Sequence, residues 1–207
     1  MINLCRSVPP FNKNGYIAAC SRTRDAVLID PGDEVGQLLA DANRAQLRIR
    51  LILLTHAHLD HITGVDTARR ASGAPVWLHA ADQPLYERVV QQGQMFGIRV
   101  EQQSPVDHFY GDQPLPAIGD LSIQVHPTPG HSPGGVALEI NQALFVGDTL
   151  FAGSVGRTDL PGGDHDTLIN SIRTVLFAFP DGTPVFAGHG PETTIGRERL
   201  TNPYVRG

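Results

Sequence analysis

The stretch THAHLDH, residues Thr55–His61, is the most informative part of this chain. It follows a short run of apolar residues that predicts a buried strand, so it lies where a strand ends. Alternate residues of an extended segment point to the same side, and His56 and His58 can therefore reach one metal ion. Asp60 and His61, where a helix is expected to begin, can turn toward a second ion. Imidazole and carboxylate ligands suit zinc, iron or manganese, and a motif without cysteine excludes a structural thiolate site.

Three more motifs place a histidine or an aspartate at the end of an expected strand: TPGHSPGG at Thr128–Gly135, VGDTLF at Val146–Phe151 and GHGP at Gly188–Pro191. Glycine beside these residues allows the sharp turns and close backbone approach that a metal site needs. His131 and His189 are therefore candidate ligands, and Asp148 is the candidate carboxylate that bridges two ions. We interpret the other four histidines as ordinary, partly buried side chains: His79, His108, His126 and His165.

Composition limits the classes of function. The 207 residues are expected to form a single domain, 1–207, that needs no disulfide to fold. A formal net charge of -5 without runs of Lys or Arg argues against a nucleic-acid partner. No apolar stretch approaches the ~18 residues of a membrane span, and no secretory signal is evident, so we expect a cytoplasmic protein that contacts no membrane. Cys5 and Cys20 are expected to be free thiols, and no obligate protein partner is indicated.

Strands alternate with helices in the first half of the chain, which predicts an α/β protein. Three short strands are expected to form a meander: Ile2–Val8, Tyr16–Cys20 and Ala26–Asp30. A helix capped by Asp33 then leads to a strand at Arg50–Leu54. A second helix, beginning around His61 to Gly64 and running to Arg70, leads to a strand at Pro75–His79 and completes a βαβ unit. The stretch that follows is less regular, with a helix expected near Gln83–Gln92.

The second half of the chain repeats this layout. From Ser122 the alternation of apolar and polar residues predicts antiparallel strands, with Asn141 and Gln142 turning the chain into a strand at 143–147. Asp166 is expected to cap a helix whose apolar residues recur as far as Phe179. A strand at Pro184–Ala187 follows it. Two half-domains of similar layout are therefore expected.

Taken in order, the motifs HxHxDH, PGHS, GDT and GHG resemble those of the metallo-β-lactamase superfamily, and particularly of hydrolases similar to glyoxalase II, the hydroxyacylglutathione hydrolases. The match spans nearly the whole chain. The stretch GRTDLPGGD, Gly156–Asp164, is similar to the single-domain bacterial members of that group. The resemblance implies a mixed α/β (α+β) fold, an αββα sandwich of two mixed β-sheets flanked by helices.

The resemblance also implies a centre of two divalent metal ions. One ion would be bound by His56, His58 and His131, the second by Asp60, His61 and His189, and Asp148 would bridge both. Zinc is the first expectation, with iron or manganese as alternatives. A hydroxide that bridges the ions would attack the substrate carbonyl, with Asp60 and Asp148 as the carboxylates of the reacting centre. No serine or cysteine nucleophile is then required.

The implied substrate is a small-molecule thioester such as S-lactoylglutathione, because its thiolate leaves readily. The typical enzyme has a C-terminal helical extension, and a lysine and a tyrosine in the loop after GDTLF, where this chain has AGSVGRTDLPGG. Weak saturation by the glutathione thioester is therefore expected. Arg157 is a candidate partner for a substrate carboxylate, and the alternative is a pair with Asp159 or Asp164. Asp30, by resemblance, would orient a metal-bound histidine, and a plain turn aspartate is the alternative.

Two other functions stay open at this stage. A persulfide dioxygenase on the same fold would use one iron bound by His56, His131 and Asp148, so metal count and oxygen consumption would discriminate. A non-catalytic binding protein is the third class, although all seven implied ligands are present. A β-lactamase is disfavoured because no export signal is evident and the aspartate of GDT is the bridging ligand typical of the hydrolases.

Overall fold

The computed structural model describes residues 1–205 of the chain. The chain forms two compact units, Met1–Leu121 and a second that begins at Ser122. Each unit has its own β-sheet, helices and apolar core. This division agrees with the two half-domains expected from the sequence, whereas a single domain over 1–207 stays a prediction.

The first unit is built on a six-stranded sheet in the order β1-β2-β3-β4-β5-β6. Its strands are β1 (Ile2–Val8), β2 (Lys13–Ala19), β3 (Asp25–Ile29), β4 (Arg48–Leu53), β5 (Val76–Leu78) and β6 (His108–Phe109). β1, β2 and β3 are antiparallel neighbours, which confirms the predicted meander. β3, β4, β5 and β6 run parallel because each connection crosses over outside the sheet. The carboxyl ends of β3 and β4 therefore lie at the same edge.

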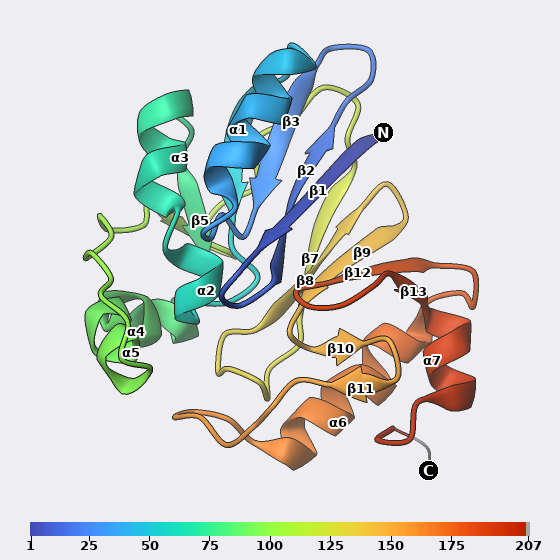
Figure 1. Ribbon diagram of the computed structural model, residues 1–207. Helices are drawn as coiled ribbons and strands as arrows, with labels where there is room; N and C mark the ends of the chain where they lie inside the picture. Colours follow the sequence, from blue (N-terminus) through green and yellow to red (C-terminus); the bar gives the residue numbers. More distant parts are fainter. Residues whose placement is uncertain (206–207) are drawn as a thin grey trace. The chain divides into compact units, whose positions relative to one another are not determined.

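Helices cover one face of this sheet, as the blue and green ribbons of Figure 1 show. They are α1 (Val35–Arg44), α2 (Leu59–Ile62), α3 (Val65–Ser72), α4 (Gln83–Glu87) and α5 (Val89–Met95), with a 3-10 turn, η1, at Ala80–Asp82. Leu38 and Ala42, one helical turn apart on α1, are buried in the same core as Leu28 of β3 and Ile52 of β4. Burial of this apolar stripe is what holds α1 against the sheet.

One helix prediction in this unit is confirmed and another needs correction. The helix expected to begin around His61 to Gly64 and to run to Arg70 is α3, which the short helix α2 precedes. Gly64, at the N-cap of α3, packs closely on Gly32, where a Cβ would meet the Gly32 oxygen at 2.4 Å. The prediction that Asp33 caps α1 is wrong. Glu34 occupies the N-cap position, and Asp33 accepts a hydrogen bond from the Thr63 hydroxyl at 3.0 Å.

The second unit has a five-stranded sheet in the order β13-β12-β9-β8-β7, and a separate hairpin. The strands are β7 (Ile123–Pro127), β8 (Val136–Ile140), β9 (Ala143–Gly147), β12 (Pro184–Ala187) and β13 (Thr193–Thr194), and the hairpin is β10 (Leu150–Phe151) with β11 (Ser154–Val155). β7 and β9 are both antiparallel to β8, and β12 is parallel to β9. β7, β9 and β12 thus run in one direction and end at one edge of the sheet.

The predicted turn at Asn141 and Gln142 is confirmed by its backbone. The φ angles of the two residues are 49° and 66°, and two consecutive positive values define the hairpin turn that matches the twist of antiparallel strands. Asparagine tolerates this left-handed conformation better than most residues. The turn places Leu144 and Val146 of β9 in the core of the unit.

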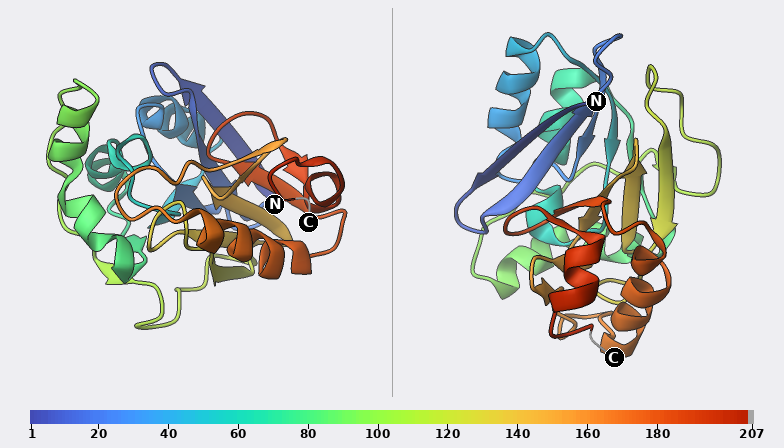
Figure 2. Two further views of the ribbon diagram at one scale, coloured as in Figure 1. Left: turned by 90° about the horizontal axis from the view of Figure 1, so that it is seen from below. Right: turned by 90° about the vertical axis from the view of Figure 1, so that its right-hand side faces the viewer.

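The helices of the second unit are α6 (His165–Thr174) and α7 (Ile195–Thr201), with a 3-10 turn, η2, at Leu176–Ala178. Both pack into one core with β9 and β12, and Figure 2 shows them as the orange and red helices of this unit. The cap of α6 is Asp164, not Asp166 as predicted. Asp164 is extended, and its Oδ1 accepts a hydrogen bond from the N–H of Thr167 at 2.7 Å, whereas Asp166 already lies in the first helical turn.

The two cysteines lie in the first unit as free thiols, Cys5 exposed and Cys20 buried. The N–H groups of Thr23 and Asp120 donate hydrogen bonds to the Cys20 sulfur. Among the helices of residues 1–205, none combines the length and hydropathy that crossing a membrane requires.

The corrected cap can be tested directly. Asp164→Ala should lower the melting temperature by about 2–4 °C, because the substitution leaves the N–H of Thr167 without its acceptor. The hydrogen bond from Thr167 lowers the pKa of Asp164, so this contribution is present above the pKa of the unfolded state and is lost as the pH falls through the lower folded value. Asp166→Ala is the matched control. A larger loss in Asp166→Ala than in Asp164→Ala, measured by thermal unfolding at pH 7, would reverse the assignment.

Candidate metal centre

The candidate ligands of the first unit stand at one edge of its sheet. Asp30 follows β3 directly, and β4 leads into residues Thr55–His61, which we call the ligand loop. Because β3 and β4 are parallel, their carboxyl ends meet, and residues 25 positions apart in sequence come into contact there. The sheet topology therefore brings Asp30 to the ligand loop.

The carboxylate of Asp30 organises the ligand loop. Its Oδ1 accepts a hydrogen bond from the N–H of Thr55 at 2.7 Å, and its Oδ2 accepts one from the Thr55 hydroxyl at 2.6 Å. Oδ2 also lies 3.0 Å from Nδ1 of His61. Asp30 is only 2% exposed, so these bonds form in a medium of low dielectric where each is strong. The contact with a candidate ligand is thus present, and the role of Asp30 in orienting a bound ligand stays a prediction.

The hydrogen bonds determine which ring nitrogen of two histidines carries the proton. The Thr55 hydroxyl gives its only proton to Asp30, so it accepts from Nδ1 of His56, 3.1 Å away. Nδ1 of His61 donates in the same way to Asp30. Both rings then have their lone pair on Nε2, the form in which a neutral imidazole binds a metal ion.

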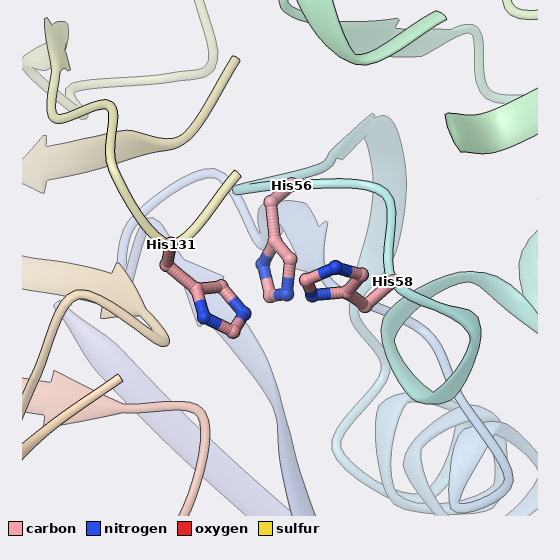
Figure 3. Close-up of side chains that lie close together, drawn as sticks. All are labelled: His56, His58 and His131. Atoms are coloured by element: carbon pink, nitrogen blue, oxygen red, sulfur yellow. The ribbon is translucent and has the colours of Figure 1, made fainter. Parts of the chain in front are cut away.

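The four candidate ligands of the ligand loop lie close together. Figure 3 shows the rings of His56 and His58 as neighbours on this loop, with centroids 4.9 Å apart at an angle of 84°. The rings of His56 and His61 have centroids 4.0 Å apart, and Oδ2 of Asp60 lies 3.7 Å from Nε2 of His61. Donor atoms of Asp30, His56 and His61 all lie within 4.8 Å of one another. Packing of this density among metal-binding groups is typical of a metal site.

The second unit gathers its three candidate ligands independently. His131 follows β7, Asp148 follows β9 and His189 follows β12, and these three strands end at one edge. Oδ2 of Asp148 lies 3.6 Å from Nε2 of His131 and 3.5 Å from Nε2 of His189. His131 also appears in Figure 3, on the loop between β7 and β8. One carboxylate oxygen therefore faces two imidazole nitrogens, the geometry expected of a bridging ligand.

Two glycines allow the loops of this unit to approach each other. A Cβ on Gly156 would meet the Asp148 backbone oxygen at 1.8 Å and Nδ1 of His131 at 3.1 Å. Gly130 has a φ of 130°, and a Cβ there would meet the backbone of Leu168 at 2.2 Å. Only glycine fits at either position, so close packing around the candidate ligands requires these two glycines.

Arg157 contributes to the site through its backbone. Its carbonyl oxygen lies 2.7 Å from Nδ1 of His131, which donates a proton to it and therefore has its lone pair on Nε2. The guanidinium pairs with Asp159 through two hydrogen bonds of 2.7 Å and lowers the pKa of that carboxyl to about 2. The structure thus shows the intramolecular pair that was the alternative for Arg157, and a substrate role for its side chain stays a prediction.

The donor set fits divalent metal ions. Three of the candidate histidines have Nδ1 held by an acceptor, so that Nε2 is the ligating atom. Two of the candidates are aspartates, whose negative charge would offset that of a divalent ion. The chemistry of the seven candidates therefore suits a divalent ion, and their role as ligands stays a prediction: His56, His58, Asp60, His61, His131, Asp148 and His189.

A buried ion pair that the motifs did not reveal supports this arrangement. Nζ of Lys13 lies 2.6 Å from Oε1 of Glu34, and the two side chains are 2% and 1% exposed. Lys13 also donates to the carbonyl oxygen of Asp30, and Glu34 accepts the N–H of Gly32 at 2.9 Å. The pair therefore holds the turn that presents Asp30. Lys and Glu side chains are mostly exposed in proteins, so no local sequence signal could identify this buried ion pair.

Glu198 of α7 plays a comparable part in the second unit. Its buried carboxylate accepts hydrogen bonds from Thr193, from the N–H of Gly153 and from Asn202, at 2.5, 2.8 and 2.9 Å. Gly153 lies in the hairpin after Asp148, and Thr193 lies four residues after His189. One carboxylate thus ties together the segments that follow two candidate ligands. Asp82 and Gln92 of the first unit, also missed from sequence, contact the ligand loop directly.

Comparison with known proteins identifies the family. A family model described as the metallo-beta-lactamase superfamily matches residues 8–189. This chain belongs to the metallo-β-lactamase superfamily. The hydroxyacylglutathione hydrolase GloC of Haemophilus influenzae is 35% identical over 186 residues, which cover 88% of this chain and 88% of that protein.

Solved structures of superfamily members share the fold. The crystal structure of the BLEG-1 B3 metallo-beta-lactamase has a TM-score of 0.92 and 38% identity, and the match covers 100% of both chains. TTHA1623, solved in a di-iron-bound form, has a TM-score of 0.86 and 40% identity, covering 97% of this chain and 99% of that one. The predicted fold class, the mixed α/β metallo-β-lactamase fold, is confirmed. Membership of this superfamily and a relative named as a hydrolase support a metal-dependent hydrolase.

The close approach of Gly156 to Asp148 leads to a prediction. Gly156→Ala should destabilise the protein by about 1–3 kcal/mol and reduce its bound metal, because the new methyl group overlaps the Asp148 backbone and must displace it. Gly182→Ala is the control in the same unit, since a Cβ there meets nothing within 4 Å. Chemical denaturation and elemental analysis of both variants check this. Equal metal content and stability in Gly156→Ala and Gly182→Ala would show that the loop tolerates the displacement.

Proposed function

We propose that this protein hydrolyses a small-molecule thioester such as S-lactoylglutathione, using two divalent metal ions. The observation that carries the proposal is the complete set of seven ligand candidates, with the second unit's Asp148 oxygen within 3.6 Å of both His131 and His189 nitrogens. Membership of the superfamily and the relative named hydroxyacylglutathione hydrolase add support. Zinc is the first expectation, with iron or manganese as alternatives.

The proposed ligand sets follow the residues of each loop. His56, His58 and His131 would bind the first ion, and Asp60, His61 and His189 the second, with Asp148 contacting both. The extended backbone at His58 and the start of α2 at Leu59 support a division of the ligand loop into these two sets. The 3.7 Å separation of Asp60 and His61 ligand atoms supports their sharing an ion.

Ions bound in this way would make a water nucleophilic at neutral pH and polarise the carbonyl that it attacks. The residues of the chain have two tasks in this reaction. Asp60 and Asp148 would offset part of the positive charge of the centre, and Asp30 and the Arg157 carbonyl hold ligand rings in one tautomer. A thioester suits this set of groups because a thiolate leaves without a strong general acid.

A second candidate is hydrolysis of a β-lactam, favoured by the likeness to the BLEG-1 B3 metallo-beta-lactamase. Both reactions begin with attack on a carbonyl, so the same ions would serve either. We rank the thioester first because Asp148 adds a second carboxylate to the centre, as expected for the hydrolases similar to glyoxalase II. Substrate tests described below separate the two.

The ligand sets predict how metal content responds to substitution. The purified protein should hold up to two metal ions per chain. Asp148→Ala should abolish hydrolysis and reduce metal at both positions, because Asp148 contacts both ions, whereas His189→Ala should mainly empty the second. Elemental analysis after loading with zinc, iron or manganese measures this. His165→Ala, at an exposed histidine outside the motifs, is the control. Unchanged metal content in Asp148→Ala would contradict the bridge, and no metal in the unsubstituted protein would contradict the whole centre.

The substrate prediction concerns affinity. The protein should hydrolyse S-lactoylglutathione with weak saturation and should tolerate changes in the thiol half. Attack on the carbonyl depends on the ions, whereas affinity depends on remote contacts, and Arg157, the candidate partner for a substrate carboxylate, is already paired with Asp159. Steady-state kinetics on thioesters with trimmed thiol portions check this.

Three outcomes of the substrate tests would contradict the predicted weak affinity or the proposed reaction. A low micromolar KM for S-lactoylglutathione, lost sharply on trimming, would show a dedicated glutathione site. Turnover of a chromogenic cephalosporin above that of any thioester would favour the second candidate. Oxygen consumption with a glutathione persulfide and one iron per chain would favour a dioxygenase.

A further inference from the structure

The start of α2 is capped in an unusual way. A helix commonly begins with a residue whose own side chain accepts a hydrogen bond from the first N–H groups. α2 begins after His58, whose side chain makes no capping hydrogen bond. The N–H of Leu59, the first residue of α2, donates instead to Oε1 of Gln92 at 3.0 Å. Gln92 lies on α5, 33 positions away in sequence, so the cap comes from another helix and the His58 imidazole is not used for it.

Gln92 holds the chain on both sides of His58. Its Nε2 donates to the carbonyl oxygen of Ala57 at 3.0 Å, while its Oε1 accepts the N–H of Leu59. In an extended segment the C=O of one residue and the N–H two residues later point to the same side, and His58 is extended, with φ -73° and ψ 150°. One side-chain amide can therefore pair with both groups, as a peptide of a neighbouring strand would.

Asp82 completes this set of contacts from the end of η1. Its Oδ2 accepts the N–H of Ala57 at 3.0 Å, on the same side of the extended segment as the two groups that bind Gln92. Both side chains are buried, Asp82 at 0% and Gln92 at 9% exposure. A second hydrogen bond from Nε2 of Gln92 to the Leu85 carbonyl, at 2.8 Å, holds the amide itself in one orientation.

We propose that Gln92 and Asp82 are positioning residues for His58. They keep the chain extended at His58, up to the point where α2 begins at Leu59, so that His56 and His58 point alike while Asp60 and His61 turn with the helix. This inference rests on the proposed function, in which His58 binds an ion. Asp30 contacts Thr55 and His61, at the two ends of the ligand loop, whereas Gln92 and Asp82 contact its middle. Loss of Gln92 should therefore weaken the ion held by His58 more than the other ion.

The first measurement needs no metal. Gln92→Met keeps the length of the side chain and removes all three of its hydrogen bonds, and Gln94→Met is the control at an exposed position of the same helix. In the metal-free protein, amide exchange at Leu59 should become about tenfold faster in Gln92→Met, the equivalent of one hydrogen bond, and should not change in Gln94→Met. If Gln92→Met does not fold, Gln92→Leu, which also removes all three hydrogen bonds, takes its place with the same expected result.

The second measurement separates the two ions. In a His189→Ala background only the ion of His56, His58 and His131 should remain, and Gln92→Met should weaken its affinity by about 10–100-fold in a chelator competition. In a His131→Ala background, which isolates the other ion, the same substitution should change the affinity by less than about threefold. A role in general stability would lower both affinities together with the melting temperature.

The outcomes distinguish this inference from the proposed function. Faster exchange at Leu59 together with selective weakening of the first ion supports the positioning role. Unchanged exchange at Leu59, or equal weakening of both ions, overturns it even where metal binding and hydrolysis are normal. A protein that binds no metal contradicts the proposed function, and the exchange measurement alone then decides whether Gln92 holds the ligand loop.

Discussion

The buried carboxylate of Asp30 is the contact on which the candidate site of the first unit depends. It accepts hydrogen bonds from two groups of Thr55 and one of His61, and so joins the end of β3 to the loop after β4. Hydrogen bonds to a charged acceptor contribute about 1.5–3 kcal/mol each, and an ionised carboxylate without partners would be costly in this environment. Because Asp30 links the ends of two parallel strands, it also fixes the orientation of imidazole rings on the loop.

Two further pairs of buried side chains hold the segments next to Asp30 and the ligand loop. Lys13 and Glu34 form a buried ion pair that holds the turn behind Asp30, and removal of one partner of such a pair typically costs about 3–5 kcal/mol. Gln92 of α5 and Asp82 of η1 hold the middle of the ligand loop. The backbone polar groups of the loop that these side chains contact are satisfied from three places, the end of β3, η1 and α5, so the loop is held from several sides.

The second unit positions its candidate ligands through strand direction and glycines. Three strands that run in one direction bring His131, Asp148 and His189 to one edge, and glycines permit the close contacts between their loops. Arg157 shows how backbone and side chain can serve separate purposes. Its carbonyl holds the His131 ring, while its guanidinium is paired with Asp159. A substitution of the Arg157 side chain therefore tests the ion pair and leaves the carbonyl contact available.

Local sequence determined the meander, the parallel strands, the Asn141–Gln142 turn and the ligand motifs, because alternation, turn residues and short spacings are properties of neighbouring positions. Both cap predictions were wrong: Asp33 and Asp166 stand near helix starts, yet Glu34 and Asp164 occupy the N-cap positions. Tertiary structure alone decided which side chains support the ligands. Gln92 contacts Leu59 across 33 positions and Lys13 contacts Glu34 across 21, and partners so far apart leave no periodic pattern in the chain. A buried amide or ammonium group is stabilised only by the specific acceptors that folding brings to it, so its role cannot be recognised before the fold is known.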